Sequence, residues 1–239
     1  MEGIEKIKKT FSEMGHELTE KQAEQFYIYY EMLVETNKVM NLTAITEFDE
    51  VIQKHFVDSI VKTEVFVEKG VETLIDVGTG AGFPGIPLKI MYPQLKVTLL
   101  DSLNKRLNFL NQVIEKIGLE EIRTVHYRAE DGARTVELRE KFDCVVSRAV
   151  ANMSTLCEYC LPYAKTGGCF VAYKSGNAEE EVEKAKKAIH LLGGVKEKTI
   201  SFELPDSDIG RSLVVIRKKE TTSKKYPRKA GLPSKEPLQ

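Results

Sequence analysis

Hydrophobic positions in the first 70 residues recur at a helical spacing. After Thr19, the apolar side chains lie three or four residues apart, which predicts an amphipathic helix with Thr19 as its N-cap. They are Phe26, Tyr29, Tyr30, Leu33 and Val34. A second helical face runs from Val51 to Ile60, with Thr46 as a candidate cap. Residues 1–70 are therefore expected to form an N-terminal helical extension.

From Val71 onward, short apolar runs alternate with helical stretches. The predicted strands are residues 73–77, 96–100, 122–126, 142–146 and 168–172. The predicted helices between them are residues 104–117, 131–139, 153–164 and 178–192. Strands that alternate with helices indicate an α/β fold with a mainly parallel sheet covered on both faces.

The last third of the chain departs from this alternation. Residues 195–202 and 211–216 form two predicted strands without a helix between them, which favours an antiparallel pair at the edge of the sheet. The final segment is rich in Lys, Arg and Pro and is predicted to be irregular. The expected organisation is a helical extension over 1–70, a ligand-binding domain over 71–219 and a basic tail over 220–239.

Composition and charge exclude several classes of protein. The net charge is −1, so any surface for nucleic acid must be local. The apolar runs are too short for a transmembrane helix, and the charged N-terminus lacks the apolar region of a signal peptide. A cytoplasmic location is therefore expected. Cys157 and Cys160 have C-x-x-C spacing but no second pair, which favours apolar helix positions over a metal site.

A glycine-rich turn follows the first predicted strand and points to a cofactor. Residues 76–85 read Asp-Val-Gly-Thr-Gly-Ala-Gly-Phe-Pro-Gly. Gly80 to Gly85 matches the G-x-G-x-x-G pattern of dinucleotide-binding proteins. With Asp76 included, the segment also resembles motif I of class I methyltransferases, whose glycines here are Gly78, Gly80 and Gly82. A tight turn without a ligand is the structural alternative.

Two further features bear on the choice of cofactor. Asp101 ends the second predicted strand, where a carboxylate can accept hydrogen bonds from both ribose hydroxyls of either cofactor. The antiparallel strand pair at the C-terminal end favours the Rossmann-like class I methyltransferase fold, and therefore S-adenosylmethionine over NAD. Ala129 and Glu130 follow the third strand, where an adenine is expected, and Arg148 follows the fourth, facing the substrate. Solvated surface charges are the alternative interpretation of Glu130 and Arg148.

The residues after the fourth strand also bear on the chemistry. Ser147-Arg148-Ala149 replaces the Asn/Asp-Pro-Pro-Tyr motif typical of transfer to an exocyclic amine. Cys144 and Cys169 are poorly placed for the nucleophile that a pyrimidine C5 reaction requires. Guanine N7 carries a free lone pair and loses no proton on attack, so its methylation needs alignment but no general base. The pattern favours an N7 target without a catalytic side chain.

Several motifs together resemble the bacterial small-subunit ribosomal RNA methyltransferase G family, also called glucose-inhibited division protein B. They occupy residues 41–46, 55–59, 76–85, 101–106, 147–150 and 226–233. The resemblance implies N7-methylation of a guanosine in the helix-18 loop of 16S rRNA. It also implies cofactor contacts at Gly78, Phe83, Ala129, Glu130 and Arg148. The expected partner is 16S rRNA or the small ribosomal subunit, bound by a monomer that needs no metal. The alternatives are another RNA, a small-molecule substrate, or a nucleotide-binding protein without methyl transfer.

The basic tail and Arg148 carry two more expectations. Eight Lys and Arg side chains lie between Arg217 and Lys235. The segment from Tyr226 to Lys229 is expected to dock rRNA, with Tyr226 stacked on a base or ribose, although a disordered terminus is the simpler interpretation. Arg148 is expected to be exposed, so that its loss costs methyl transfer and little stability.

Overall fold

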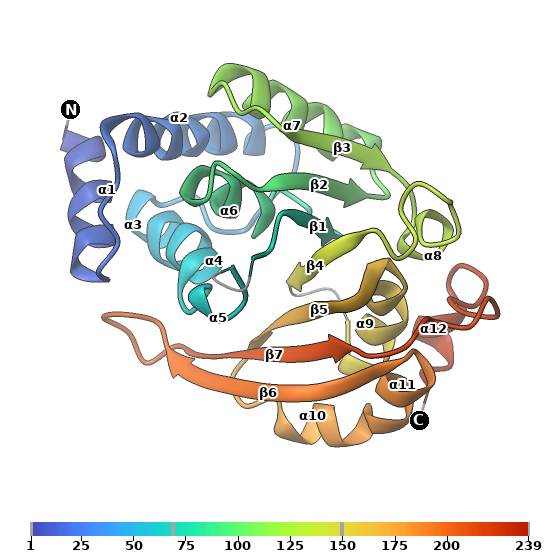
Figure 1. Ribbon diagram of the computed structural model, residues 1–239. Helices are drawn as coiled ribbons and strands as arrows, with labels where there is room; N and C mark the ends of the chain where they lie inside the picture. Colours follow the sequence, from blue (N-terminus) through green and yellow to red (C-terminus); the bar gives the residue numbers. More distant parts are fainter. Residues whose placement is uncertain (1, 68–69, 149–150, 239) are drawn as a thin grey trace.

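The computed structural model describes residues 2–67, 70–148 and 151–238. Its described strands form one seven-stranded sheet in the order β3-β2-β1-β4-β5-β7-β6 (Figure 1). They are β1 (Thr73–Val77), β2 (Lys96–Asp101), β3 (Ile122–His126), β4 (Phe142–Arg148), β5 (Ala164–Ser175), β6 (Gly194–Glu203) and β7 (Gly210–Lys218). The strands β1 to β5 pair in parallel, whereas β7 runs antiparallel to both β5 and β6. The predicted α/β class, the parallel sheet and the antiparallel C-terminal pair are confirmed.

Helices cover both faces of this sheet. On the N-terminal side they are α1 (Glu2–Glu13), α2 (Glu20–Asn37), α3 (Phe48–Val51), the π-helix η1 (Ile52–Val57), α4 (Asp58–Ile60) and α5 (Glu64–Val67). The others are α6 (Gly85–Met91), α7 (Asn104–Lys116), α8 (Ala129–Gly132), α9 (Met153–Cys160), the 3₁₀ turn η2 (Leu161–Tyr163), α10 (Glu179–Lys184), α11 (Lys186–Leu191) and α12 (Leu232–Lys235). Thr19 caps α2 through a capping box with Gln22, as predicted.

Three local predictions about helices are wrong. The helix expected over 131–139 is the four-residue α8, and the following turns end at Glu140, whose φ of 52° is incompatible with a right-handed helix. The helix expected over 178–192 is divided at Ala185 into α10 and α11. Glu47, and not Thr46, occupies the N-cap position of α3.

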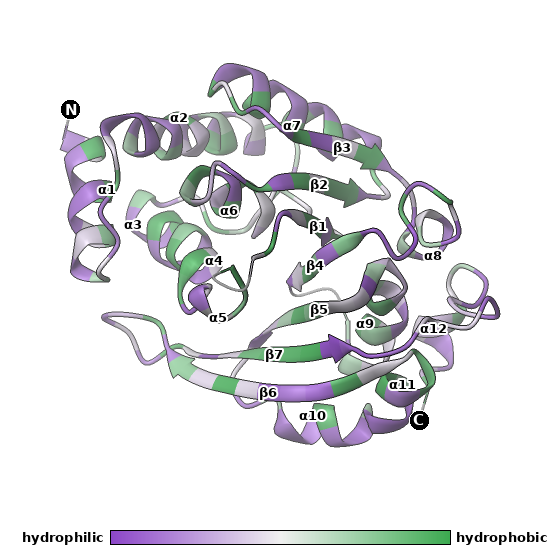
Figure 2. Cartoon of the chain, viewed as in Figure 1, coloured by the Kyte–Doolittle hydropathy of each residue, from purple (hydrophilic) through white to green (hydrophobic). Residues whose placement is uncertain are grey.

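Two apolar clusters, one on each face, hold the helices to the sheet. Alternate β1 residues face opposite clusters, with Leu74 on one side and Ile75 on the other. Figure 2 shows hydrophobic residues on the central strands, whereas the outer helices α1, α7 and α10 are largely hydrophilic. The four cysteines lie buried in these clusters.

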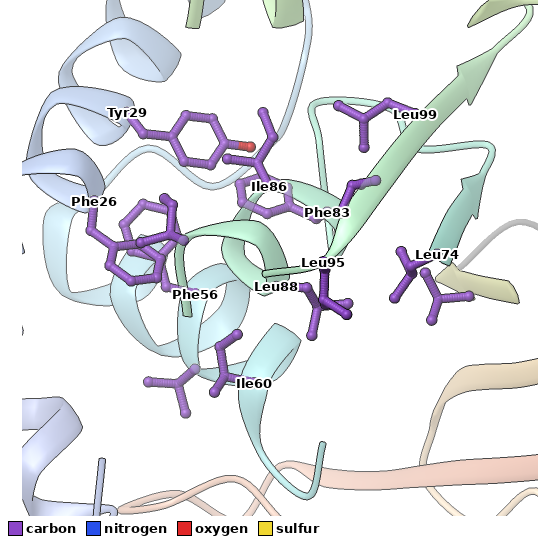
Figure 3. Close-up of a cluster of buried hydrophobic side chains, with 14 of the residues drawn as sticks. Phe26, Tyr29, Phe56, Ile60, Leu74, Phe83, Ile86, Leu88, Leu95 and Leu99 are labelled. Atoms are coloured by element: carbon purple, nitrogen blue, oxygen red, sulfur yellow. The ribbon is translucent and has the colours of Figure 1, made fainter. Parts of the chain in front are cut away.

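The N-terminal helices share one of these clusters with the sheet. Phe26, Tyr29 and Phe56 point toward Phe83 and Ile86, at the start of α6 (Figure 3). The change at residue 70 is therefore a change of secondary structure and not a break in the hydrophobic core. This packing fixes the helices against the glycine-rich turn.

The C-terminal segment is largely irregular, as predicted, but it is packed against the domain, and its exposed cations include Lys224, Lys225 and Lys229. Tyr226 is only 8% exposed, so it is not free to stack on RNA. Arg228 pairs with the fully buried Glu158. Lys218 is also buried, and it donates to the Leu161 carbonyl and to Thr222 Oγ1. Burial lowers the pKa of Lys218 to about 8. These cations stabilise the packing of the segment.

Candidate cofactor and substrate site

A pocket of about 520 Å³ opens at the carboxyl ends of β1, β2 and β4. It lies where β1 has β2 on one side and β4 on the other, which is the point where the strand order reverses. Ligands of open α/β sheets bind at such switch points, and the volume is in the range of cofactor sites. Of the eight predicted cofactor residues, seven line this pocket: Gly78, Gly80, Phe83, Asp101, Ala129, Glu130 and Arg148.

The glycine-rich turn forms the floor of the pocket. Gly78 and Gly80 have φ angles of 74° and 61°, which favour glycine. A Cβ on Gly80 would meet no atom closer than the Gly78 carbonyl oxygen, 4.0 Å away, so it would project into open space. The turn is therefore a cradle that a side chain would fill, as expected for a surface on which a cofactor lies.

Gly82 has a different environment from the other two glycines. It does not line the pocket, and a Cβ there would lie 2.7 Å from Tyr29 Oη and 2.8 Å from Ile86 Cδ1. Tyr29 Oη also donates to the Ala81 carbonyl at 2.6 Å. Gly82 thus allows α2 to pack closely against the turn, and its predicted contact with a cofactor stays a prediction.

Two carboxylates hold the turn in shape. Asp76 is fully buried, and its Oδ2 accepts from Thr79 Oγ1 at 2.7 Å and from Gly85 N at 2.9 Å. Burial raises the pKa of Asp76 to about 6. Asp101 accepts from Gly80 N through Oδ2 at 2.9 Å and from Leu103 N through Oδ1 at 2.8 Å. Arg106 Nη1 also donates to Oδ2 at 3.4 Å, whereas Oδ1 keeps capacity for a further hydrogen bond, as a contact with ribose requires.

Arg148 lies in a buried cluster and is not an exposed charge. Its Nη1 lies 3.2 Å from Asp58 Oδ2, and its side chain is only 13% exposed. Its Cζ is 5.0 Å from the centroid of the Phe83 ring. Asp58 also pairs with Arg211, at 2.8 Å. The expectation that Arg148 is exposed is therefore wrong. Because its loss would leave a buried carboxylate with one partner fewer, we now expect a larger effect on stability. Ala149 and Val150 lie outside the described residues.

His55 completes this cluster, although no chemical role for it is evident from the sequence alone. Its ring stacks on Phe83 at 4.4 Å, with an interplanar angle of 15°. Arg148 Nη2 lies 3.3 Å from His55 Nδ1. Because a guanidinium only donates, Nδ1 is the acceptor, and Nε2–H donates to Thr43 Oγ1 at 2.8 Å. Burial, followed by the charge of Arg148, lowers the pKa of His55 to about 3.

The π-helix η1 explains how the N-terminal region reaches the site. Single π-turns often occur at functional sites, because they redirect side chains relative to an α-helix. Here η1 contains His55, and Asp58 follows at its C-cap. Both residues and Thr43 fall in two motifs of the family resemblance, residues 41–46 and 55–59, which were the sequence signal for this cluster.

A second cavity of about 340 Å³ lies beside the first, and His55 and Arg148 line both. The remainder of its wall is a mixture of apolar, aromatic and cationic side chains. These include Ile45, Tyr173, Phe202, Leu213, Lys54, Lys174 and Arg211. The site thus has two adjacent compartments, as a transferase needs for a donor and an acceptor.

Glu130 lies at the opposite end of the first pocket. Its Oε1 accepts from Gly231 N at 2.7 Å, so the C-terminal segment reaches the pocket, which Gly231 and Ser234 also line. Tyr163 Oη donates to the Ala129 carbonyl at 2.7 Å and fixes the start of α8. The roles of Ala129 and Glu130 in cofactor binding stay predictions.

Metal and membrane features are not found in the described residues. No group of three or more His, Cys, Asp or Glu side chains there is arranged to hold a metal ion. None of the helices in this part of the chain is both long and apolar enough to cross a bilayer.

Comparison with known proteins places these features in a family. The model of the rRNA small subunit methyltransferase G family matches residues 22–209. The chain is 56% identical to ribosomal RNA small subunit methyltransferase G of Lachnoclostridium phytofermentans over 225 residues, 94% of this chain and 93% of that protein. It is 48% identical to the protein of that name from Clostridium perfringens (strain 13) over 238 residues, which cover both chains fully.

A solved structure supports the fold. The structure of M. jannaschii TYW2 in complex with S-adenosylmethionine matches with a TM-score of 0.55 at 15% identity, over 73% of this chain and 79% of that chain. The glycine cradle, Asp101 and the volume of the pocket fit this cofactor. The chain belongs to the rRNA small subunit methyltransferase G family, and S-adenosylmethionine is its cofactor.

Proposed function

We propose that this protein methylates N7 of a guanosine in the helix-18 loop of 16S rRNA, as a monomer in the bacterial cytoplasm. The relatives' names support the small ribosomal subunit RNA as substrate. The observation that carries the N7 assignment is the chemistry of the wall between the two cavities, which consists of His55 and Arg148. Neither of these side chains is suited to remove a proton at neutral pH.

The two wall residues are engaged as hydrogen-bonding partners. His55 uses both ring nitrogens, one with Thr43 and one with Arg148. Its pKa of about 3 makes it a poor base. Arg148 stays charged, and both oxygens of the neighbouring Asp58 accept from arginines. A target that loses no proton suits this environment, and guanine N7 is such a target.

The position of each residue in the two cavities indicates its role in the reaction. When bound, S-adenosylmethionine supplies an electrophilic methyl group on a sulfonium. Asp101 holds the ribose, and the Gly78–Gly80 backbone lets the cofactor lie close to the chain. The guanine enters the second cavity, where Phe202 offers an aromatic surface, and N7 forms its bond to carbon as the carbon–sulfur bond breaks. Phe83, His55 and Arg148 fix the orientation of the two compartments, which contributes to the rate through alignment.

Nucleoside analysis of small-subunit rRNA tests this proposal. A strain that lacks the gene is expected to lose one 7-methylguanosine, and the wild-type gene is expected to restore it. Gly80→Val, which fills the cradle, should not restore it, and Phe202→Ala should restore it only partly. An unchanged level of 7-methylguanosine in the deletion strain would reject the assignment.

A further inference from the structure

The C-terminal segment, residues 226–235, is anchored to the domain by a buried ion pair. Arg228 N and Nε donate to Glu158 Oε1 at 2.7 and 3.0 Å, and Arg228 Nη2 donates to Oε2 at 2.7 Å. Glu158 belongs to α9 and has no exposed side-chain surface. A bidentate pair with an added main-chain bond fixes both the side chain and the backbone of the segment.

Further contacts hold the segment on either side of this pair. Arg139 Nη1 donates to the Tyr226 carbonyl at 3.0 Å, and Thr155 Oγ1 donates to the Pro233 carbonyl at 3.0 Å. Arg134 also donates to the Pro227 carbonyl. In Figure 1, α12 lies beside α9 and below α8. The segment is therefore held in a defined path toward the cofactor pocket.

The segment reaches the pocket at Gly231 and Ser234. Gly231 has a φ of 83°, which bends the chain so that its N–H donates to Glu130 Oε1. Ser234 interacts with the Tyr159 hydroxyl. These residues line the same end of the pocket as Tyr127 and Ala129. This is the end where the sequence places the adenine.

We propose that residues 226–235 form the outer wall of the S-adenosylmethionine pocket, and that Gly231 positions Glu130 for its contact with the cofactor. The segment lies beyond residue 209, where the match to the family model ends. Its buried Tyr226 and paired Arg228 serve this wall and are not available for docking RNA. The inference rests on S-adenosylmethionine as the cofactor and is independent of the N7 assignment.

Hydrogen exchange of the unmodified protein tests directly whether cofactor binding affects residues 226–235. Addition of S-adenosylhomocysteine is expected to slow amide exchange at Gly231 and the neighbouring residues, together with residues 78–80 in the glycine turn. Protection of the turn with no change in residues 226–235 would overturn the proposal. This readout needs no substitution and no methyl transfer.

Calorimetry on a matched pair of variants provides a second test. Gly231→Pro removes the N–H that bonds Glu130 and forbids the positive φ. Gly231→Ala keeps the N–H and meets no neighbouring atom, and because a φ of 83° is strained for any L side chain, it also controls for that strain. We expect S-adenosylhomocysteine affinity to fall roughly tenfold or more in the Pro variant and only slightly in the Ala variant. Equal affinity in both folded variants would contradict the role of this hydrogen bond.

Truncation and charge removal separate the pocket wall from an RNA-docking tail. A chain that ends at Lys229 keeps the Arg228–Glu158 pair and loses Gly231 and Ser234, so cofactor affinity should fall. The variant Lys219→Gln/Lys224→Gln removes two exposed cations that lie outside residues 226–235 and should leave cofactor affinity unchanged. Wild-type cofactor affinity in the truncated protein, or a loss of cofactor affinity in the charge variant, would refute the assignment.

Discussion

Arg148 shows how one residue links stability to the site. It directly ends β4, but the chain folds α4 over it, so its guanidinium pairs with Asp58 and packs on Phe83. We expect Arg148→Ala to lower the free energy of unfolding by about 3 kcal/mol, the low end for a broken buried pair, since Arg211 still contacts Asp58. Urea denaturation measures this loss.

An exposed ion pair supplies the control for Arg148. Lys9 and Glu13 lie 3.8 Å apart on the surface of α1, and both side chains are more than half exposed. Lys9→Ala should leave the urea midpoint nearly unchanged, because such pairs are weak in water. Similar midpoints for the two variants would mean that Arg148 is not a structural residue.

The glycines of the turn should respond differently to the same substitution. Gly80→Val should lose at least about tenfold in S-adenosylhomocysteine affinity, because its side chain enters the pocket and its φ of 61° strains the turn. Gly82→Val should instead lower stability by about 3 kcal/mol, because the new Cβ clashes with Tyr29, Ile86 and Leu110. Thermal denaturation with calorimetry distinguishes the two, and a folded Gly80→Val protein with full affinity would disprove the cradle.

The buried His55 predicts a pH dependence of stability. Its pKa is 6.5 without the fold and about 3 within it. Between these values the unfolded chain binds a proton that the folded chain does not. The contribution of neutral His55 to the free energy of unfolding is therefore complete above about pH 6.5 and is lost as the pH falls toward 3. The raised pKa of Asp76 has the opposite effect on stability. Between pH 3.8 and about pH 6 the folded chain holds a proton that the unfolded chain does not, so this contribution to stability grows as the pH falls.

A comparison with His55→Gln isolates the part of the pH dependence of stability that comes from His55. The stability of the wild type relative to this variant should fall by about 1.4 kcal/mol from about pH 7.5 to about pH 5.5. Urea unfolding at a series of pH values measures the difference. A difference that stays constant over this range would show that His55 is protonated equally in both states.

At the scale of elements, the hydrophobic pattern predicts most of the sheet and fails where tertiary contacts decide. The strand runs 73–77 and 122–126 agree with β1 and β3, since buried apolar runs are local signals. The helix predicted over 131–139 does not form. Arg139 there donates to the carbonyls of Ala133, Thr222 and Tyr226, and the last two lie beyond β7. No local pattern contains that information.

The contact of α2 with the glycine turn makes the N-terminal helices part of the site. Tyr29 is fully buried, and its hydroxyl is a hydrogen-bond donor to Ala81. Tyr29→Phe should cost about 1–3 kcal/mol of stability, because it leaves a buried carbonyl without this partner. It should also weaken cofactor binding by loosening the turn. Unfolding and calorimetry check both effects, and an unchanged midpoint would mean that α2 does not support the turn.

At the scale of the molecule, the sequence predicts the ligand pocket better than its surroundings. Residues at strand ends, such as Gly80, Asp101 and Glu130, meet in one pocket because parallel strands align their carboxyl ends. The wall of His55 and Arg148 between the two cavities depends on how a π-helix from the N-terminal region packs over β4. The wall at Gly231 depends on 100 residues of intervening chain closing on Glu130, as the separation of 101 positions indicates.

The proposed reaction transfers a methyl group to N7 of a guanosine in small-subunit rRNA. It is tested most directly by supplying methyl-labelled S-adenosylmethionine and rRNA made with either guanosine or 7-deazaguanosine, in which carbon replaces N7. We predict label in the guanosine RNA, recovered as 7-methylguanosine, and none in the 7-deazaguanosine RNA, which should still compete for binding. Equal labelling of both RNAs would contradict transfer to N7.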